Sequence, residues 1–437
     1  MIIVDTALEK CEKAGRPIRV ALVGAGYMGR GIALEILTPI TGMRLAAISN
    51  RTLSGAARAY REAGVNAVKS VSSLAELETA VAAGQCAVTD DAMLLAEADG
   101  IDVLIEATGE IEFGSKVVSH ALGHGKHVVL MNAEMDATVG PILKVHADRN
   151  GVVLTSTDGD EPGVAMNLYR LVKTLGFKPV VAGNFKGILD PYRTPETQRA
   201  FAERYNQRPR MITSFADGTK LGMETCILAN ATGFKVAKRG MHGHRCAHVK
   251  DALQLYSVEH VVEQGIVDFL LGAEPGTGAY VLGYCDQPVK QQYMNYFKMG
   301  DGPLYAFYTP YHLPHLQIVT TVARAALFHD ATVAPLGKPM CDVITMAKHD
   351  LKAGEVLDGI GGFTCYGTID NAEITAAEQL LPMGLSEGCR LIRDVPKDYA
   401  IAYEDVIVPE GRWCDRLRAE QNEHFGLMRM PAATLSS

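Results

Sequence analysis

The sequence predicts an α/β fold built from three successive parts. Over residues 1–155, short apolar runs alternate with amphipathic segments, which is typical of strand–helix–strand units on a parallel sheet. From 156 to 330 the spacing becomes irregular, and polar clusters interrupt the apolar runs. From 331 to 437 short runs are broken by glycines, which indicates a compact, mostly β part. We therefore expect three domains with these limits.

Six apolar runs in the first part are candidate strands. They are Arg19–Val23, Arg44–Ile48, Cys86–Thr89, Asp102–Ala107, His127–Met131 and Val152–Thr155. Helical patches are expected at Ala56–Ala63 and Leu74–Ala83. Two of the runs end in short polar stretches, at Thr108-Gly109 and at Asn132 to Glu134. Because ligands bind at the carboxyl ends of strands in open α/β sheets, we expect these stretches to face a ligand.

The first run leads directly into a glycine-rich turn, Gly24-Ala25-Gly26-Tyr27-Met28-Gly29. Glycines at these offsets allow a tight turn, close approach of the backbone to a pyrophosphate, and close packing of helix on strand. The pattern predicts a Rossmann dinucleotide-binding domain over residues 1–155. The candidate cofactor-binding residues are Gly24, Gly26, Tyr27, Met28, Gly29, Asn50, Arg51, Ala107, Thr108, Gly109, Asn132 and Glu134.

The end of the second run indicates which dinucleotide binds. Rossmann sites that prefer NAD usually end this strand on Asp or Glu, which bonds the ribose hydroxyls. Here a neutral Asn50 is followed by a cationic Arg51, which suits a 2′-phosphate. The sequence therefore predicts an NADPH site.

An acidic segment, Asp158-Gly159-Asp160-Glu161-Pro162-Gly163, follows the last predicted strand. Three carboxylates within four residues repel one another unless a cation neutralises them, either a divalent metal or a lysine. We take Asp158, Asp160 and Glu161, with Glu224, as candidate metal ligands. The alternative is an acidic helix N-terminus with Pro162 at its first position.

A second polar segment places Lys220 and Glu224 four residues apart, on one face of an expected helix that spans Gly222 to Leu228. Lysine can bind a phosphate or polarise a carbonyl group, and glutamate can complete a metal site. The alternative is a surface salt bridge, which contributes only about 0.3–0.5 kcal/mol. The apolar residues around the pair favour burial, where such a pair seldom serves stability alone.

Further candidates stand at the ends of predicted elements. Lys186 follows the apolar run Val180–Gly183, and Arg193 precedes a helix expected from Thr194, with Thr as N-cap and Pro195 at the first position, to about Tyr205. Each cation is either a phosphate ligand or an exposed loop charge. Lys186, Lys220, Asp160 and Glu224 are the candidate catalytic residues. The candidate substrate-binding residues are Lys186, Arg193, Lys220, Asn230 and His312.

Helical periodicity also marks Ser257–Gln264 and Gln317–Phe328. The histidine-rich stretch from Met241 to His248 suggests a metal cluster, but Gly243 breaks the spacing that helical zinc ligands need. We interpret it as a polar loop.

Composition excludes several classes of protein. A net charge of −8 and a pI near 5.9 argue against a nucleic-acid surface or a basic membrane patch. Nine cysteines without a CxxC pair fit free thiols in a reducing compartment. No apolar run approaches membrane-spanning length, and the N-terminus does not resemble a secretion signal. The expectation is a cytoplasmic protein without nucleic-acid or membrane partners.

Together these motifs resemble the homoserine-dehydrogenase-like oxidoreductases that carry a C-terminal SAF domain. The resemblance spans nearly the whole chain and is most specific in the tail, at Asp350 to Glu355, Gly361 to Phe363, Leu381 to Leu385 and Tyr403 to Val406. It implies a catalytic and dimerisation domain over 156–330, a SAF-like domain over 331–437, and a homodimer.

Within that group the chain is most similar to deoxyxylulose-phosphate reductoisomerase-like enzymes. This resemblance implies NADPH-dependent conversion of a phosphorylated sugar, 1-deoxy-D-xylulose 5-phosphate, to 2-C-methyl-D-erythritol 4-phosphate with Mg²⁺ or Mn²⁺, in isoprenoid precursor synthesis. Conventional reductoisomerases have a lysine after the fifth strand, where this chain has Ala133. If the activity is shared, Lys186 or Lys220 must replace that lysine.

Two other functions remain open. One is a plain NADP-dependent dehydrogenase of homoserine or of an alcohol derived from a sugar acid, which requires no metal. The other is an NADPH-binding sensor or scaffold, in which Arg51 would still control cofactor affinity.

Overall fold

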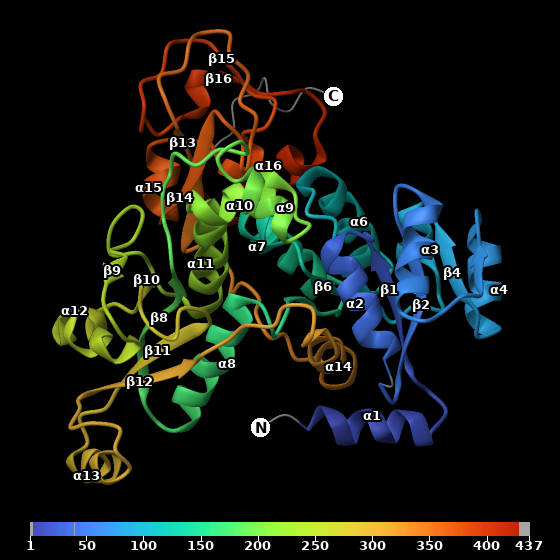
Figure 1. The fold of residues 1–437 in the computed structure, drawn as a ribbon, viewed down its shortest axis with the longest axis horizontal. Coiled ribbons are helices and arrows are strands. Elements are labelled where there is room, and N and C mark those ends of the chain that lie inside the picture. The colour runs from blue at the N-terminus through green and yellow to red at the C-terminus, as the bar shows by residue number, and fades with distance from the viewer. Residues whose placement is uncertain (1–2, 39, 428–437) are drawn as a thin grey trace. The chain divides into compact units, whose positions relative to one another are not determined.

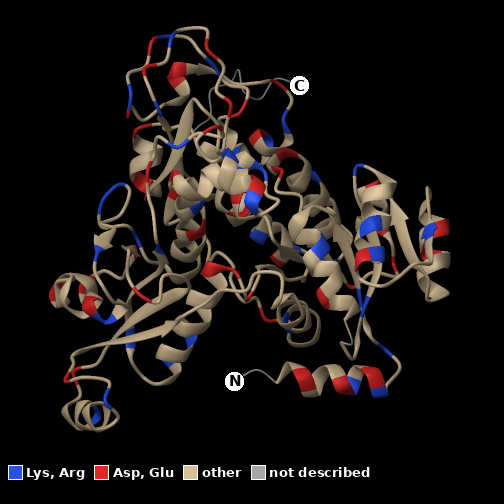
Figure 2. Ribbon diagram, in the orientation of Figure 1, with Lys and Arg blue, Asp and Glu red and all other residues tan. Residues whose placement is uncertain are grey.

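The computed structural model describes residues 3–38 and 40–427. They form two compact units (Figure 1). Unit 1 comprises Met1–Asp160 and Leu313–Ala334, and unit 2 comprises Glu161–His312 and Pro335–Ser437, as far as each is described. Figure 2 shows Lys and Arg interspersed with Asp and Glu along both units. Across the described ranges, no helix combines the length and apolarity needed to cross a membrane.

Unit 1 is built on a parallel sheet of seven strands in the order β3-β4-β2-β1-β5-β6-β7. The strands are β1 Ile18–Val23, β2 Met43–Ser49, β3 Val68–Ser70, β4 Cys86–Thr89, β5 Val103–Glu106, β6 His127–Leu130 and β7 Leu154–Ser156. The chain passes from β1 to β2 on one side and returns to β5 on the other. This reversal places the ligand-binding crevice of such sheets at the carboxyl ends of β1 and β5.

Seven helices from the first segment of unit 1 connect or flank these strands, and an eighth lies in its second segment, Leu313–Ala334. They are α1 Val4–Lys13, α2 Tyr27–Leu37, α3 Leu53–Glu62, α4 Leu74–Ala82, α5 Ala92–Glu97, α6 Ile111–Gly123, α7 Ala133–Arg149 and α14 Ile318–Phe328. Ile318 and Val322 of α14 are fully buried in one apolar core with Leu22 and Ile105. This burial explains why the chain returns to unit 1 after residue 312.

Unit 2 contains a mixed sheet of five strands in the order β12-β11-β8-β10-β9, in which β8 and β10 are parallel and β11 is antiparallel to β8. The strands are β8 Lys178–Lys186, β9 His244–Arg245, β10 Ile266–Leu271, β11 Ala279–Tyr284 and β12 Leu304–Thr309. The helices are α8 Glu161–Thr174, α9 Arg199–Arg204, α10 Pro209–Ala216, α11 Thr219–Thr232, the 3₁₀ helix η1 Val249–Gln254, α12 Val258–Glu263 and α13 Pro288–Tyr296.

The C-terminal part of unit 2 holds two antiparallel strand pairs, β13 with β14 and β15 with β16. Its elements are β13 Cys341–Ala347, β14 Cys365–Asn371, α15 Ala372–Ala377, η2 Met383–Leu385, β15 Arg390–Leu391, η3 Tyr403–Asp405, β16 Val406–Ile407 and α16 Trp413–Phe425. Helix α11 packs against β13, β14 and α8, and all of its residues are buried. Any charged side chain on α11 is therefore held away from water.

The predicted α/β fold class is confirmed, and each of the six predicted strands lies within two residues of an observed one. The helices expected at Ser257–Gln264 and Gln317–Phe328 are also present, as α12 and α14. The helix expected from Thr194 to about Tyr205 is present only in its second half, because residues 195–198 form turns and α9 runs from Arg199 to Arg204. The Thr194 N–H donates to the Thr197 hydroxyl at 2.9 Å and the Thr197 N–H donates to the Thr194 hydroxyl at 3.4 Å, so Thr194 caps this turn and not α9. The division into three domains stays a prediction.

Candidate active site

Unit 2 gathers five polar side chains from three elements. Glu161 is the first residue of α8, and Asn184 and Lys186 lie two residues apart near the carboxyl end of β8, on the same face of the strand. Lys220 and Glu224 lie one turn apart on α11. Because α8 packs against both β8 and α11, the three elements bring these side chains together.

The centre of this carboxylate–lysine cluster is the ammonium group of Lys186. Its Nζ lies 2.7 Å from Glu161 Oε2 and 3.4 Å from Glu224 Oε2. Lys220 Nζ lies 3.9 Å from Glu224 Oε1, and Asn184 donates its side-chain N–H to Glu161 Oε2. The Lys186 side chain is 15% exposed and the two glutamates 5% and 4%, so the cluster is shielded from solvent but reachable at Lys186.

Burial and mutual charge set the protonation of this cluster. Desolvation raises the pKa of Glu224 to about 7, and the charge of Glu161 raises it as well, while Lys186 and Lys220 lower it. For Lys186, desolvation lowers the pKa, but Glu161 and Glu224 outweigh it and hold the pKa above its ordinary value. Lys186 is therefore a buried ammonium at neutral pH. Glu161 and Glu224 accept two of its three N–H groups, which leaves one for a substrate oxygen.

His312 borders the cluster on its more exposed side. Its Nδ1 lies 3.8 Å from Glu161 Oε1 and 2.9 Å from the Thr277 hydroxyl, and its side chain is 31% exposed. A histidine between a buried carboxylate and water can exchange protons with solvent.

Three of the predicted metal ligands, Asp158, Glu161 and Glu224, pair with protein cations in this structure. The Lys186 ammonium occupies the position between Glu161 and Glu224 that a cation would take. Asp158 pairs with Arg324 in unit 1, at 2.5 Å, and its other oxygen accepts from the Thr332 hydroxyl at 2.6 Å. Asp160 is half-buried at the end of the same unit. Protein side chains thus supply a cation to Asp158 and to Glu161, and the metal role of the four carboxylates stays a prediction.

The glycine-rich turn of unit 1 fits a dinucleotide. Gly24 has φ +99°, and a Cβ there would lie 2.8 Å from the carbonyl oxygen of Ala107. A Cβ on Gly29 would lie 2.0 Å from the carbonyl oxygen of Gly24, so both positions require glycine. A Cβ on Gly26 would meet nothing within 4 Å, and Gly26 caps α2, which begins at Tyr27 and continues through Met28. This open helix N-terminus is what a pyrophosphate needs.

Asn50 supports that turn from the end of β2. Its Oδ1 accepts the N–H of Ala25 at 3.2 Å, and its Nδ2 donates to the backbone carbonyl of Thr52 at 3.1 Å. Arg51, beside it, is exposed. The two residues therefore differ: Asn50 shapes the loop, and Arg51 has a side chain open to a ligand.

The ends of β5 and β6 are held by their own polar side chains. Thr108 donates to Glu106, and Asn132 caps α7 by accepting the Met135 N–H at 3.1 Å. Glu134, in the first turn of α7, is buried. The cofactor roles of these residues stay predictions, as do those of Ala107 and Gly109.

Glu106 is not among the predicted site residues. It ends β5, is fully buried, and its Oε2 has no hydrogen-bond partner among the described residues. Desolvation raises its pKa to about 7, against the hydrogen bonds from Thr108. The sequence offered one signal for it, a carboxylate at the carboxyl end of a parallel strand.

A Glu106→Gln variant tests this buried acid. The folded pKa, about 7, lies above the ordinary 4.5, so the acid's contribution to stability is complete below about pH 4.5 and is lost as the pH rises through 7. From about pH 5 to about pH 8 the wild type should lose on the order of 2 kcal/mol relative to the variant, measured by urea unfolding. Glu110→Gln, at an exposed carboxylate nearby, should behave as the wild type. Equal pH dependence in Glu106→Gln and wild type would contradict the assignment.

Two predicted substrate residues have hydrogen-bond or ion-pair partners within unit 2. Arg193 pairs with Asp190 at 2.9 Å and is 36% exposed. Asn230, on α11, accepts the N–H groups of Met340 and Cys341 at 2.7 and 3.1 Å, which attaches the start of β13 to the helix. Their roles in substrate binding stay predictions.

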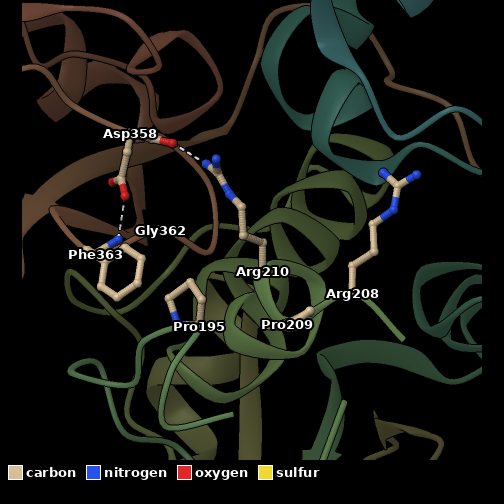
Figure 3. Close-up of a pocket in the computed structure, with 7 residues that line it drawn as sticks. All are labelled: Pro195, Arg208, Pro209, Arg210, Asp358, Gly362 and Phe363. Carbon is tan, nitrogen blue, oxygen red and sulfur yellow. Dashed lines mark hydrogen bonds between the residues drawn. The ribbon is translucent and has the colours of Figure 1, made fainter. Parts of the chain in front are cut away.

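A separate cavity of about 430 Å³ lies in unit 2, between α10 and the loop around residues 358–363 (Figure 3). Arg210 on its wall donates to the carbonyl oxygens of Asp358 and Ile360, and Phe363 lines it from the loop. It shares no residue with the carboxylate–lysine cluster, and Arg210 is occupied in holding the loop.

Residues 159–318 match the family model of the catalytic domain of oxidoreductase DRL. This segment contains the whole carboxylate–lysine cluster. The match supports an oxidoreductase enzyme, in line with the predicted class. Comparison with curated proteins found no match.

Several solved structures are similar in part. Apo scyllo-inositol dehydrogenase from Lactobacillus casei aligns with 72% of this chain and 89% of its own at 13% identity and a TM-score of 0.42. A probable dehydrogenase from Thermotoga maritima aligns with 73% of this chain and 91% of its own at 14% identity and a TM-score of 0.41. An NAD-binding oxidoreductase from Klebsiella pneumoniae aligns with 41% of this chain and less than half of its own, 45%, at 17% identity and a TM-score of 0.29.

Proposed function

We propose that the protein is an NADP(H)-dependent oxidoreductase that interconverts a carbonyl compound and an alcohol. The observation that carries the proposal is the buried ammonium of Lys186, held between Glu161 and Glu224 with one N–H available. A fixed positive charge at this position stabilises the negative charge that develops on a carbonyl oxygen during reduction.

The cofactor assignment rests on the glycine-rich turn and on Arg51. Gly24 and Gly29 admit no side chain, and Gly26 leaves the helix N-terminus open. Arg51 is exposed and directly follows Asn50, which hydrogen-bonds to the turn. When bound, the nicotinamide cofactor supplies or accepts the hydride.

The side chains of unit 2 would handle the proton. In the direction of reduction, Lys186 Nζ donates a proton to the substrate oxygen as the carbon accepts hydride. Glu161 and Glu224 orient Nζ and keep it charged until that step, and Lys220 balances the charge of Glu224. Lys186 then needs a new proton. His312, which lies 3.8 Å from Glu161 and is partly exposed, returns one to it from solvent.

An Arg51→Ala variant tests the preference for NADPH. Loss of a charge-assisted contact to the 2′-phosphate costs about 1.5–3 kcal/mol, so the Kd for NADPH should rise about tenfold or more while that for NADH stays unchanged. Fluorescence titration of the two cofactors measures this. Arg58→Ala on α3, where Arg58 pairs with Glu62, is the matched control and should change neither Kd. Equal weakening for both cofactors would contradict the 2′-phosphate role.

A second candidate is the metal-dependent reductoisomerase of 1-deoxy-D-xylulose 5-phosphate, which the match to the DRL catalytic domain favours. An assay of nicotinamide absorbance distinguishes this reductoisomerase from the metal-free oxidoreductase. It is run with this substrate and NADPH, and with homoserine and NADP⁺, each in the presence of Mn²⁺ or of EDTA. Turnover that persists in EDTA supports the metal-free reaction at Lys186. Methylerythritol phosphate formed only with Mn²⁺ supports the reductoisomerase. Cofactor binding without turnover of either substrate would indicate that the protein acts on another substrate or is an NADPH-binding sensor.

A further inference from the structure

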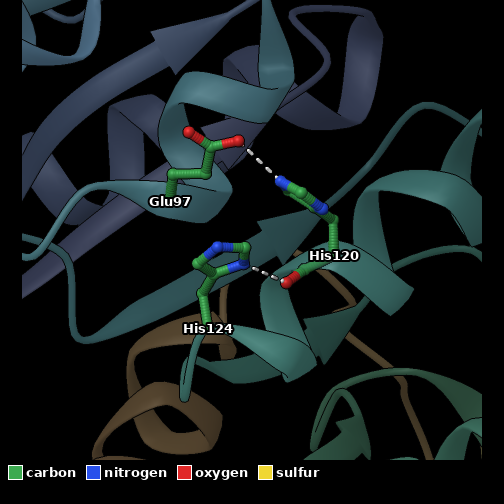
Figure 4. A group of neighbouring side chains, drawn as sticks. All are labelled: Glu97, His120 and His124. Atoms are coloured by element: carbon green, nitrogen blue, oxygen red, sulfur yellow. Dashed lines mark hydrogen bonds and ion pairs between the residues drawn. The ribbon is translucent and has the colours of Figure 1, made fainter.

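Unit 1 brings together three side chains of the kinds that ligate metals, none of them among the predicted dinucleotide residues. Glu97 is the last residue of α5, His120 lies in the last turn of α6, and His124 caps the end of α6 (Figure 4). One ligand atom from each residue lies within 4.8 Å of the other two. Among the described residues this is the only group of three or more His, Cys, Asp or Glu that meets that criterion.

The spacing and the packing of the two helices explain why the three side chains meet. His120 and His124 are four residues apart, so both project from one face of the helix, with ring centroids 4.5 Å apart. Helix α5 packs against α6 and brings Glu97 to that face, where its Oε1 lies 2.7 Å from His120 Nε2. Two imidazoles four residues apart, with a carboxylate from a second element, form a common donor set for zinc.

Hydrogen bonding prepares His124 as a ligand. Its Nδ1 lies 2.9 Å from the carbonyl oxygen of His120, and because a carbonyl can only accept, Nδ1 carries the hydrogen. The neutral ring then has an unprotonated Nε2. Zinc-bound histidines are usually oriented in this way, by a hydrogen bond from the other ring nitrogen to a carbonyl or carboxylate group.

We propose that Glu97, His120 and His124 bind one Zn²⁺ ion that ties α5 to α6. In the metal-free form His120 Nε2 donates its hydrogen to Glu97. For binding, the neutral His120 ring must carry its hydrogen on Nδ1 instead, so that Nε2 and the Glu97 oxygen can each bond to zinc at about 2.0–2.2 Å. Two nitrogens and one oxygen select zinc over Mg²⁺ or Ca²⁺, and the fourth position is left for water.

The side chains of the site are partly exposed, so a zinc ion can reach them from solvent and their replacement should not disturb the core. The His120 and Glu97 side chains are 37% and 35% exposed. Replacing them removes no apolar core, so the variants are expected to fold. Thermal unfolding of the metal-free proteins checks this before any metal is added.

The test is equilibrium dialysis of the untagged, metal-stripped full chain against Zn²⁺. The wild type should bind one zinc per chain, and His120→Asn, His124→Asn and Glu97→Gln should each weaken binding about tenfold or more. Two controls should bind as the wild type does: His349→Asn at an exposed histidine of unit 2, and Glu112→Gln at a carboxylate of α6 that pairs with Lys116.

Co²⁺ gives a second readout, because a tetrahedral Co²⁺ ion absorbs visible light strongly and a hydrated one weakly. The wild type should show this absorption and His124→Asn should lose it. Zinc binding of equal strength in the wild type and in all three variants, or no binding by the wild type, would overturn the proposal.

Discussion

A Lys186→Met variant is expected to lose turnover by a factor of about 10² to 10⁴ and to keep its affinity for NADPH. That factor is typical of a positioned proton donor. The reason is the location of Nζ, 2.7 Å from Glu161 and 3.4 Å from Glu224, with one N–H left for substrate. Methionine keeps the length of the side chain but supplies neither the charge nor the proton. The measurement is steady-state turnover with a parallel titration of NADPH.

Lys178→Met is the matched control for this variant. Lys178 stands at the start of the same strand, β8, and its Nζ donates to the backbone carbonyl of Val262 near the surface. Its replacement should leave turnover within about twofold of the wild type. If Lys186→Met turned over as fast as Lys178→Met, Lys186 would have no catalytic role.

A Lys348→Met variant is expected to lose about 3–5 kcal/mol of unfolding free energy, the cost of removing one partner from a buried ion pair. Lys348 Nζ lies 2.8 Å from Asp217 Oδ2 and 2.7 Å from each of the carbonyl oxygens of Arg193 and Gly362. The Lys348 and Asp217 side chains are 2% and 0% exposed. Burial already raises the pKa of Asp217, and without Lys348 the Asp217 Oδ2 and the two carbonyl oxygens would lose this charged donor.

Urea unfolding of the full chain measures this loss. The matched control is Lys352→Met, which removes the exposed partner of Asp394, where the two side chains are 71% and 61% exposed. Exposed pairs contribute about 0–1 kcal/mol, so this control should change little. A loss below about 1 kcal/mol in Lys348→Met would show that the buried contacts are not formed in solution.

Much of the fold follows from local patterns in the sequence. Buried strands of unit 1 such as β1 and β5 are apolar except for one residue each, and this is why their limits could be predicted closely. Strand β3, Val68–Ser70, was missed because it has one apolar residue among three and lies at the sheet edge. The helix expected from Thr194 starts later, at Arg199, because a favourable cap and proline also suit a turn.

The site was predicted in pieces but not as an assembly. The sequence singled out Glu161, Lys186, Lys220 and Glu224, and offered either a metal or a lysine to neutralise the acidic segment. Which of the two applies depends on contacts between residues 25 and 38 positions apart, and no local pattern specifies these. Helical spacing was applied only to the histidines after Met241, so the pair His120 and His124, which has that spacing, was missed.

The central claim is that Lys186 acts on the substrate oxygen in an NADP(H)-dependent reaction that needs no metal. The most direct test follows nicotinamide absorbance with metal-stripped wild type and Lys186→Met in EDTA, using NADPH with 1-deoxy-D-xylulose 5-phosphate and NADP⁺ with homoserine. We expect the wild type to turn over one of these substrates, and Lys186→Met to lose that turnover while it still binds the cofactor. Turnover that appears only when Mn²⁺ is restored, or that is equal in both proteins, would contradict it.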